Sequence, residues 1–318
     1  MALSTFTSFA DVDHLDNWVE LAKKIKDNPF QFQDWGRNKT LGLIFLNPSL
    51  RTRLSTQKAA LNLGMQVMVM NMNQDGWAIE MEDGTVMNAG TQEHIKEAAG
   101  VISQYCDIIG IRTFPGLKDR GEDYAENIMN KFLAHATVPV VSLESATRHP
   151  LQSFADVLTI EETKNKSKPK VVLSWAPHPR ALPQAVSNSF VEWMIGARAN
   201  LVITNPEGWD LSKNFTRDTP VLHNQEEALQ GADFVYTKNW SSFENYGAIA
   251  TGKENWMITK AKLSHTNEAK FMHCLPVRRN VVVADEVLDS PASLVLEQAN
   301  NRTFAAQTVL LKMLGYEG

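Results

Sequence analysis

Three short segments of the chain contain the residue types needed to bind an anion and to polarise a carbonyl group. The first, residues 45–53, reads FLNPSLRTR: an apolar strand, an Asn-Pro turn, then Ser49 with Arg51 and Arg53 behind it. Ser49 is expected to cap a helix. The first helical turn offers unpaired backbone N–H groups and the positive end of the helix dipole. The segment predicts a phosphate site, although a helix start with ordinary surface arginines fits it almost as well.

The second and third segments also follow predicted strands. Residues 144–156, ESATRHPLQSFAD, hold Arg148, His149 and Gln152, and His149 could donate a hydrogen bond to a polarised carbonyl. A His-Pro pair in a loop is, however, more often structural. Residues 272–280, MHCLPVRRN, contain Cys274. No arrangement that would activate a thiolate is evident there, so a turn whose carbonyls accept hydrogen bonds is the better interpretation.

Apolar, β-branched runs alternate with helical stretches and predict the elements that position these segments. Strands are expected over residues 40–46, 66–72, 106–112 and 139–144, and again over 170–176, 201–206, 233–240 and 270–276. Helices are expected after Ser49 and over residues 93–105, 184–193, 226–230 and 303–314. The helix after Ser49 should end near Gly64, with Leu50, Leu54, Leu61 and Met65 on one face. The polar residues 161–170 read as a loop.

This alternation predicts an α/β fold with two domains, each a mostly parallel sheet flanked by helices. The expected domains are residues 1–150 and 151–302, with the C-terminal helix, 303–318, packing back on the first. Polar or reactive residues stand at or just after six predicted strand ends, where ligands of open parallel sheets bind. They are Ser49, Arg112, Glu144, His178, Lys238 and Cys274.

Composition narrows the classes of function. The chain has 318 residues, a net charge of −5 and two cysteines. The charge disfavours nucleic-acid binding, and no apolar run is long enough for a membrane span. No secretory signal is evident, so we expect a cytoplasmic protein without disulfides. Neither a nucleotide-binding glycine motif nor a metal-ligand set is present, so neither a cofactor nor a metal is expected.

The motifs SLRTR, HPLQ and HCLP, in this order and spacing, resemble the aspartate/ornithine carbamoyltransferase family over nearly the whole chain. WAPHPR, YTKNW and HCLPVRRN are most similar to its branch acting on N-acylated ornithine, especially the succinylornithine members. Leu50 replaces the family's usual threonine. NWSSFENYG, residues 239–247, stands in place of the S-M-G loop of the enzymes that use free ornithine, which weighs against that substrate.

The resemblance implies two sets of binding residues and a metal-free reaction. Arg112, His149 and Thr52 would polarise the carbamoyl oxygen and are the predicted catalytic residues. Carbamoyl phosphate would be bound by Ser49, Leu50, Arg51, Thr52, Trp77, Arg112, His149, Gln152, Cys274, Leu275 and Arg302. The acyl-ornithine would contact Glu144, His178, Arg180, Lys238, Arg278 and Gln92.

The resemblance also implies a homotrimer whose active sites are shared between neighbours, with Trp77 closing over carbamoyl phosphate in the adjacent subunit, and a knotted second domain. The family's acyl-selecting residue is glutamate in acetyl-type and proline in succinyl-type enzymes, whereas Gln92 stands there in this chain. A neutral glutamine does not repel a succinyl carboxylate, and Arg180 could pair with it.

The expected activity is therefore carbamoyl transfer to N-succinylornithine, giving N-succinylcitrulline and phosphate, in arginine biosynthesis. The alternatives are an N-acetylornithine enzyme, an ornithine enzyme, and a catalytically silent module that binds carbamoyl phosphate. Retention of all three motifs disfavours the silent module.

Overall fold

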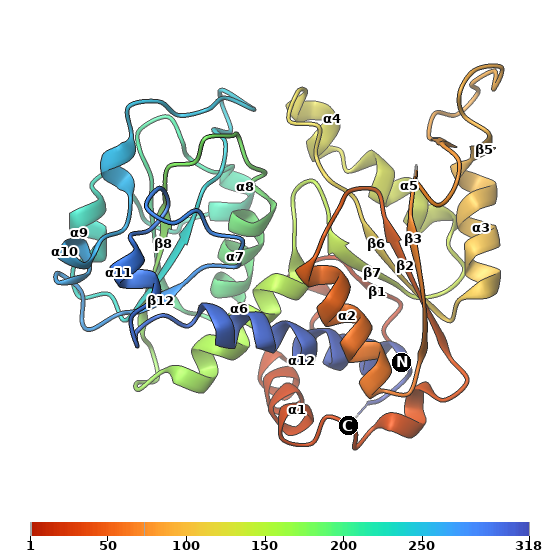
Figure 1. Cartoon of the computed structure of the whole chain (residues 1–318), viewed down its shortest axis with the longest axis horizontal. Helices are drawn as coiled ribbons and strands as arrows, with labels where there is room; N and C mark the ends of the chain where they lie inside the picture. Colours follow the sequence, from red (N-terminus) through yellow and green to blue (C-terminus); the bar gives the residue numbers. More distant parts are fainter. Residues whose placement is uncertain (1, 73, 318) are drawn as a thin grey trace. The chain divides into compact units, whose positions relative to one another are not determined.

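The computed structural model describes residues 2–72 and 74–317. Contacts divide the chain into two compact units (Figure 1). Unit 1 comprises the described residues within 1–115, 121–151 and 302–318, and unit 2 comprises residues 116–120 and 152–301. Each unit contains a five-stranded, fully parallel sheet, as the sequence predicts.

The sheet of unit 1 has the strand order β1-β7-β6-β2-β3. Its strands are β1 (Thr5–Phe6), β2 (Thr40–Phe45), β3 (Gln66–Asn71), β6 (Ile108–Arg112) and β7 (Val140–Glu144), and its helices are α1 (Leu15–Asp27), α2 (Arg51–Asn62), α3 (Ile95–Tyr105) and α5 (Asn127–His135). Every residue of β6 and β7 is buried, which explains why apolar residues predominate in both strands.

Helices cover both faces of this sheet. Ile95 and Ala99 of α3 and Phe132 of α5 pack with Ile44 and Ile111 of the strands. Helix α2 lies on the opposite face (Figure 1). This follows from right-handed crossovers, because the chain moves from β2 to β3 in one direction and from β3 to β6 in the other.

Unit 2 repeats the architecture with the order β10-β9-β8-β11-β12. Its strands are β8 (Lys170–Trp175), β9 (Asn200–Thr204), β10 (Val221–Leu222), β11 (Phe234–Lys238) and β12 (Lys270–Met272), and its short helices are α8 (Lys213–Thr216), α9 (Gln225–Leu229), α10 (Lys260–Leu263) and α11 (Asp285–Leu288). Helix α7 (Ala185–Gly196) packs on the sheet through Phe190, whose ring lies 4.3 Å from that of Tyr236.

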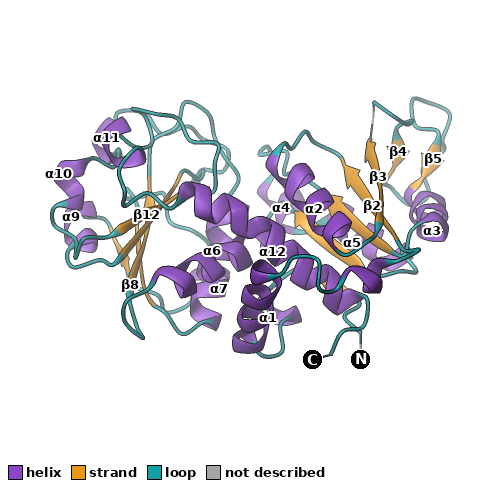
Figure 2. Cartoon of the chain, turned by 60° about the horizontal axis from the view of Figure 1, so that its bottom comes forward, coloured by secondary structure: helices purple, strands orange, loops and turns teal. Residues whose placement is uncertain are grey.

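The remaining helices, short strands and turns can be followed in Figure 2. Helices α6 (Pro150–Thr163) and α12 (Val295–Met313) each contain residues of both units. Most of α4 (Arg120–Tyr124) belongs to unit 1. Unit 1 also contains a two-stranded sheet of β4 (Ile79–Glu80) and β5 (Glu93–His94). Single 3-10 turns occupy Phe9–Asp11, Gln33–Gly36 and Glu254–Trp256. No helix within the described ranges could cross a membrane.

The helix after Ser49 differs from its prediction in two ways. Helix α2 begins at Arg51, so Leu50 and not Ser49 occupies the N-cap position; Leu50 has helical dihedral angles, and its side chain makes no capping hydrogen bond. The side of α2 that faces the core contains Thr52, Thr56, Ala59 and Ala60. These small residues let α2 approach the sheet closely, whereas Leu50, Leu54 and Leu61 are exposed. These leucines thus share one face, as predicted, but that face is turned away from the core.

Two other boundaries also differ. Residues 161–163 belong to α6 and not to the predicted loop, since Lys164 and Glu161 form an i,i+3 ion pair that extends the helical turn. The helix predicted over 93–105 begins at Ile95, because Glu93 and His94 pair with β4. The predicted knot stays a prediction.

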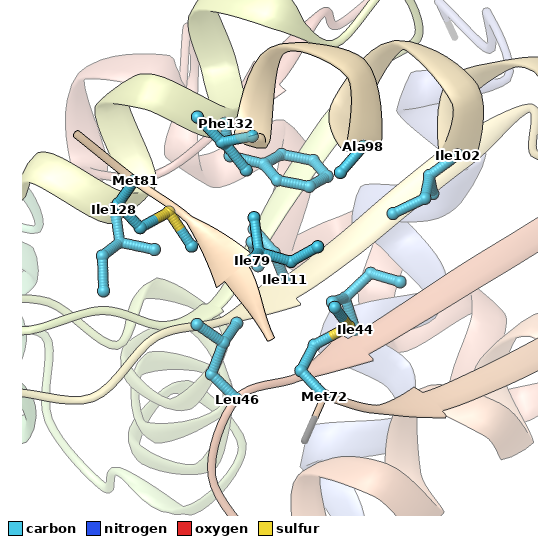
Figure 3. Close-up of a pocket in the computed structure, with 11 residues that line it drawn as sticks. Ile44, Leu46, Met72, Ile79, Met81, Ala98, Ile102, Ile111, Ile128 and Phe132 are labelled. Carbon is cyan, nitrogen blue, oxygen red and sulfur yellow. The ribbon is translucent and has the colours of Figure 1, made fainter. Parts of the chain in front are cut away.

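An apolar pocket of about 140 Å³ lies between the sheet of unit 1, α3, α5 and the β4 segment (Figure 3). Its floor includes Ile44 and Ile111, and Phe132 closes it on the side of α5. Ile79 and Met81 of the β4 segment form part of its wall. The β4 segment is thus seated on an incompletely filled apolar surface.

Candidate functional site

The sheet of unit 1 reverses its order between β2 and β6, and the predicted anion-binding residues lie at that point. Helix α2 follows β2 on one face, whereas the connection after β6 leads to α5 on the other. The chain therefore diverges beyond the carboxyl ends of these strands and leaves a crevice. Ser49 and Leu50 follow β2, and Arg112 is the last residue of β6.

Arg112 is held in place by four hydrogen bonds. Its Nε and Nη2 donate to Glu144 Oε2 at 3.0 and 2.6 Å, and its Nη1 donates to the carbonyls of Asn47 and Pro48 at 3.2 and 2.9 Å. Both charged side chains are 10% exposed. Arg112 therefore joins the end of β7 to the turn before α2. We call Arg51, Arg112, Arg302 and His149 the cationic cluster of unit 1. Glu144, predicted to contact the acyl-ornithine, lies in this cluster.

Arg302 of α12 and Thr52 of α2 meet in the same cluster. Arg302 Nη2 donates to Thr52 Oγ1 at 2.6 Å, and both side chains are buried. Because the Thr52 oxygen accepts this bond, its own hydroxyl hydrogen can be donated elsewhere. By contrast, Arg53 donates to Asn71 and lies over the Phe45 ring, 4.8 Å from its centroid, whereas Arg51 lies near His149.

His149 is a neutral imidazole among three guanidinium groups. It is buried, and burial holds its pKa well below the usual value, with Arg302, Arg112 and Arg51 lowering it further. Its Nε2 lies 4.0 Å from Glu144 Oε2. A neutral histidine here can donate a hydrogen bond to a carbonyl oxygen without adding charge.

These residues can bind a dianion and stabilise an oxyanion. Three arginines converge on the uncapped first turn of α2, whose backbone N–H groups also favour an anion. Buried, pre-positioned donors of this kind stabilise charge that develops on an oxygen during reaction. No group of His, Cys, Asp and Glu suited to a metal ion occurs in the part of the chain that the structure describes.

The sheet of unit 2 reverses its order between β8 and β11, and a second cluster lies at that point. Lys238 ends β11 and is buried. His178 and Arg180 follow β8. Arg278 Nε donates to His178 Nε2 at 3.1 Å, and His178 Nδ1 lies 3.1 Å from the Arg180 backbone nitrogen and 3.0 Å from the Arg180 carbonyl oxygen.

Burial lowers the pKa of His178 and outweighs the hydrogen bond to the Arg180 carbonyl, and the nearby charges of Lys238, Arg278 and Arg180 lower the pKa further, which favours the neutral imidazole. Three cations around a neutral histidine suit a ligand that carries carboxylates. The Arg180 and Arg278 side chains are exposed, whereas Lys238 is not.

The HCLP turn is held by a buried hydrogen-bond chain. Gln152 Nε2 and Gln298 Nε2 both donate to Asp156 Oδ1 at 2.7 Å, Gln298 Oε1 accepts from the His273 backbone at 3.0 Å, and His273 Nδ1 accepts from the Leu275 backbone at 2.9 Å. Leu275 has φ +55°, an unusual conformation for a leucine. The chain fixes the backbone at Cys274 and Leu275, whose carbonyls are the predicted acceptors.

The sequence reasoning missed Asp156, Gln298 and His273, which hold the HCLP turn. The spacing of Gln152 and Asp156, four residues apart on one helix, was a usable signal, because such side chains are neighbours. Gln298 lies 142 residues from Asp156, and nothing in the sequence indicated that contact.

Trp77 and Gln92 lie outside both clusters. Each is exposed, Trp77 by 53%, on the segment that carries β4 and β5. The structure thus gathers Ser49, Leu50, Arg51, Thr52, Arg112, Glu144, His149 and Arg302 in unit 1, and Gln152, His178, Arg180, Lys238, Cys274, Leu275 and Arg278 in unit 2.

Two family models match the chain. Residues 5–162 match the carbamoyl-P binding domain of aspartate/ornithine carbamoyltransferases, and residues 184–313 match the Asp/Orn binding domain of the same family. Together they cover the first cluster and, of the second, Lys238 and Arg278.

Similar proteins extend over almost the full chain. An N-succinylornithine carbamoyltransferase of Bacteroides thetaiotaomicron is 49% identical over 98% of this chain and 99% of its own length. An N-acetylornithine carbamoyltransferase of Xylella fastidiosa is 34% identical, with 98% of both chains covered. A solved N-acetyl-L-ornithine transcarbamylase, with a glutamate changed to alanine and carbamyl phosphate and N-succinyl-L-norvaline bound, has a TM-score of 0.91 at 31% identity, covering 98% of this chain and all of that one.

Proposed function

Since this chain belongs to the aspartate/ornithine carbamoyltransferase family, we propose that it transfers the carbamoyl group of carbamoyl phosphate to N-succinyl-L-ornithine. The products are N-succinyl-L-citrulline and phosphate, in arginine biosynthesis. One observation carries the proposal: buried Arg112 and neutral His149 flank an uncapped helix start at the sheet reversal of unit 1. The 49% identity to a succinylornithine enzyme supports the choice of acceptor.

The cationic cluster would bind and activate carbamoyl phosphate. Arg51, Arg302 and the backbone N–H groups from Ser49 to Thr52 bind the phosphate, and Trp77 covers it. Arg112, His149 and the Thr52 hydroxyl donate to the carbamoyl oxygen. Because Glu144 and two carbonyls hold Arg112 before the substrate arrives, little reorganisation is needed when charge develops on that oxygen.

Transfer then needs a neutral amine and a leaving group. The side-chain amine of the acceptor attacks the carbamoyl carbon, and a C–N bond forms as the bond from carbon to the phosphate oxygen breaks. The proton lost by the amine passes to the departing phosphate. Gln152 Oε1 and the carbonyls of Cys274 and Leu275 accept hydrogen bonds from the carbamoyl NH2, since the Gln152 amide nitrogen is directed to Asp156.

The second cluster would bind the acyl-ornithine. Lys238 and Arg278 pair with carboxylates, His178 holds Arg278 in place, and Glu144 contacts the ornithine part. Gln92 and Arg180 face the acyl group. The relative crystallised with N-succinyl-L-norvaline has lost a glutamate, and a chain with Gln92 at the acyl-selecting position likewise carries no carboxylate there.

We further propose a homotrimer in which Trp77 and Gln92 serve the neighbouring subunit. Unit 1 exposes the large apolar side chains of Leu50, Leu54, Met68 and Trp77, which a subunit interface would bury. Sedimentation should then give three times the 35.6 kDa of one chain. A monomer would contradict this part of the proposal.

The test of the activity measures phosphate release and the carbamoylated product with N-succinylornithine, N-acetylornithine and ornithine offered separately. Turnover with N-succinylornithine is expected, and Arg112→Met should reduce kcat by about 100- to 1000-fold, as for loss of an oxyanion donor. Arg37→Met, which removes an exposed arginine of unit 1, is the matched control and should leave kcat unchanged.

Other outcomes identify the alternatives. Turnover with N-acetylornithine alone would assign the acetyl activity, and turnover with free ornithine would overturn the inference from residues 239–247. Binding of carbamoyl phosphate without turnover of any acceptor would favour the silent module.

A further inference from the structure

The backbone beside Gln92 is joined to the backbone beside Trp77. The two short strands pair in parallel, with Ile79 opposite Glu93 and Glu80 opposite His94. The backbone N–H of Gln92 donates to the Ala78 carbonyl at 3.1 Å. Both residues therefore belong to one small hydrogen-bonded element.

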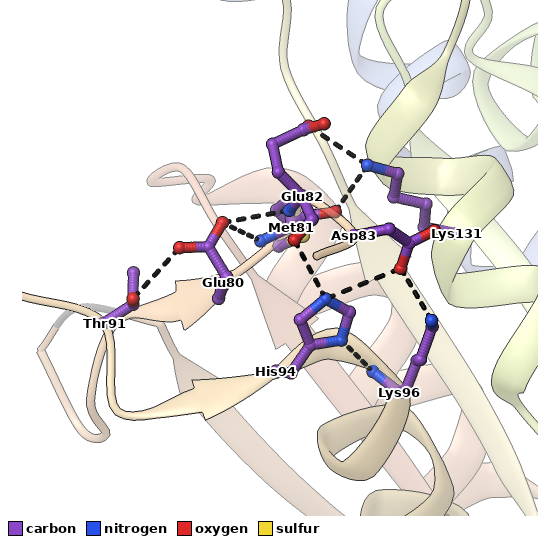
Figure 4. Close-up of polar contacts among 8 residues, drawn as sticks. All are labelled: Glu80, Met81, Glu82, Asp83, Thr91, His94, Lys96 and Lys131. Atoms are coloured by element: carbon purple, nitrogen blue, oxygen red, sulfur yellow. Dashed lines mark hydrogen bonds and ion pairs between the residues drawn. The ribbon is translucent and has the colours of Figure 1, made fainter. Parts of the chain in front are cut away.

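Two carboxylates of this element tie its strands together through side chains. Glu93 Oε2 accepts from Trp77 Nε1 at 2.7 Å. Glu80 Oε2 accepts from Thr91 Oγ1 at 3.1 Å, and Glu80 Oε1 accepts from the backbone of Met81 and Glu82, each at 2.9 Å (Figure 4). Thr91 and Glu93, which flank Gln92, are thus each bound to the segment opposite, at Glu80 and Trp77.

Contacts with α3 and α5 anchor this element to unit 1. Lys131 of α5 binds the Met81 carbonyl and pairs with Glu82 at 3.0 Å, and Lys96 of α3 pairs with Asp83 at 2.7 Å (Figure 4). Ile79 and Met81 pack against the core beneath. The base of the element is fixed, whereas the indole of Trp77 extends into solvent from it.

Of these contacts, the bond to Glu93 is the one that restrains the indole itself. A tryptophan side chain turns about two dihedral angles, and an exposed indole without a partner samples several rotamers. The bond from Nε1–H to a carboxylate selects one of them. Glu93 is also the residue directly after Gln92, so the same residue borders the position that faces the acyl group.

We propose that Glu93 is a positioning residue, which fixes the Trp77 indole relative to Gln92 so that the pair is presented to the substrates as one preformed surface. The role rests on the proposed function, in which Trp77 covers carbamoyl phosphate and Gln92 faces the acyl group. Glu93 itself touches neither substrate. Its loss should therefore weaken binding of carbamoyl phosphate by about tenfold, the effect of one hydrogen bond to a charged group.

The first measurement needs no activity. The chain contains eight tryptophans, and 5-fluorotryptophan labelling gives each a ¹⁹F resonance, with that of Trp77 identified as the one missing from Trp77→Phe. Glu93→Ala should shift and narrow the Trp77 resonance alone. Glu93→Gln keeps an acceptor oxygen and should restore most of the original position.

Glu97→Gln is the matched control, because it removes an exposed carboxylate four residues further along and should leave the Trp77 resonance unchanged. An identical Trp77 resonance in Glu93→Ala and the parent protein would overturn the proposal. An equal shift in Glu97→Gln would do the same, since the effect would then be one of charge.

The second measurement separates positioning from folding. In Glu93→Ala the KM for carbamoyl phosphate should rise about tenfold while kcat stays within twofold, and Glu93→Gln should recover the KM. A lower kcat at unchanged KM would indicate loss of active protein and would overturn the proposal. If the parent protein carbamoylates no acyl-ornithine, the proposed function fails, and the ¹⁹F result alone decides whether Glu93 holds the indole.

Discussion

Glu144→Gln is the sharpest perturbation of the cationic cluster. The carboxylate accepts two hydrogen bonds from Arg112, at 3.0 and 2.6 Å, and both side chains are 10% exposed. Glutamine can accept the same bonds but carries no charge. Each bond then falls from roughly 1.5–3 to roughly 0.5–1.5 kcal/mol. With two such bonds, the free energy of unfolding should therefore fall by about 2–3 kcal/mol.

Urea denaturation at one protein concentration measures this loss. Glu161→Gln is the matched control, since Glu161 pairs with Lys164 at 2.6 Å while 31% of its side chain is exposed. A partly exposed pair of this kind contributes less than about 1 kcal/mol. Equal losses in the two variants would refute the reasoning that the buried pair matters for folding.

Inorganic phosphate provides a second measurement on the same variant. With Glu144 neutralised, Arg112 lacks its carboxylate, and a bound phosphate can take over that function. Phosphate should therefore raise the urea midpoint of Glu144→Gln by more than that of the parent protein, through binding to the native state. Equal increases would mean that Arg112 does not bind phosphate.

Three further predictions concern other parts of the site. Gln92→Glu should shift the ratio of kcat/KM values toward N-acetylornithine, because a carboxylate repels the succinyl group; an unchanged ratio would contradict the role of Gln92. Because burial lowers the pKa of His149, the unfolded chain takes up a proton below about pH 6.5 that the native state does not. The free energy of unfolding should thus fall as the pH drops below that value. In urea titrations of His149→Gln, this part of the pH dependence should be absent. Chains carrying Trp77→Ala and chains carrying Arg112→Met, refolded together, should regain activity that neither has alone, and no recovery would argue against shared sites.

The sequence predicted the sheets better than the contacts that orient the site. Continuous apolar runs gave the strands and their parallel pairing, because strands buried on both faces need such runs. The motifs SLRTR, HPLQ and HCLP gave most of the candidate residues. The uncapped start of α2 was missed, since Ser49 fits a cap in sequence, whereas the helix begins at Arg51 and leaves Leu50, whose side chain cannot accept a hydrogen bond, at the N-cap position.

Contacts between distant segments could not be predicted from one sequence. Asp156 and Gln298 lie on different helices, and Arg302 meets Thr52 across 250 positions. The bond between Trp77 and Glu93 depends on how an irregular segment folds back on itself. Each of these contacts is set by packing, which local propensity does not describe.

The apolar pocket beneath Ile79 and Met81 should make the segment that carries Trp77, β4 and β5 respond to hydrostatic pressure. A void of about 140 Å³ is lost when the segment detaches from α3 and α5 and water takes its place. Detachment then reduces the volume of the system by roughly tens of millilitres per mole, and compression favours the smaller state. High pressure should release this segment while the two sheets stay intact.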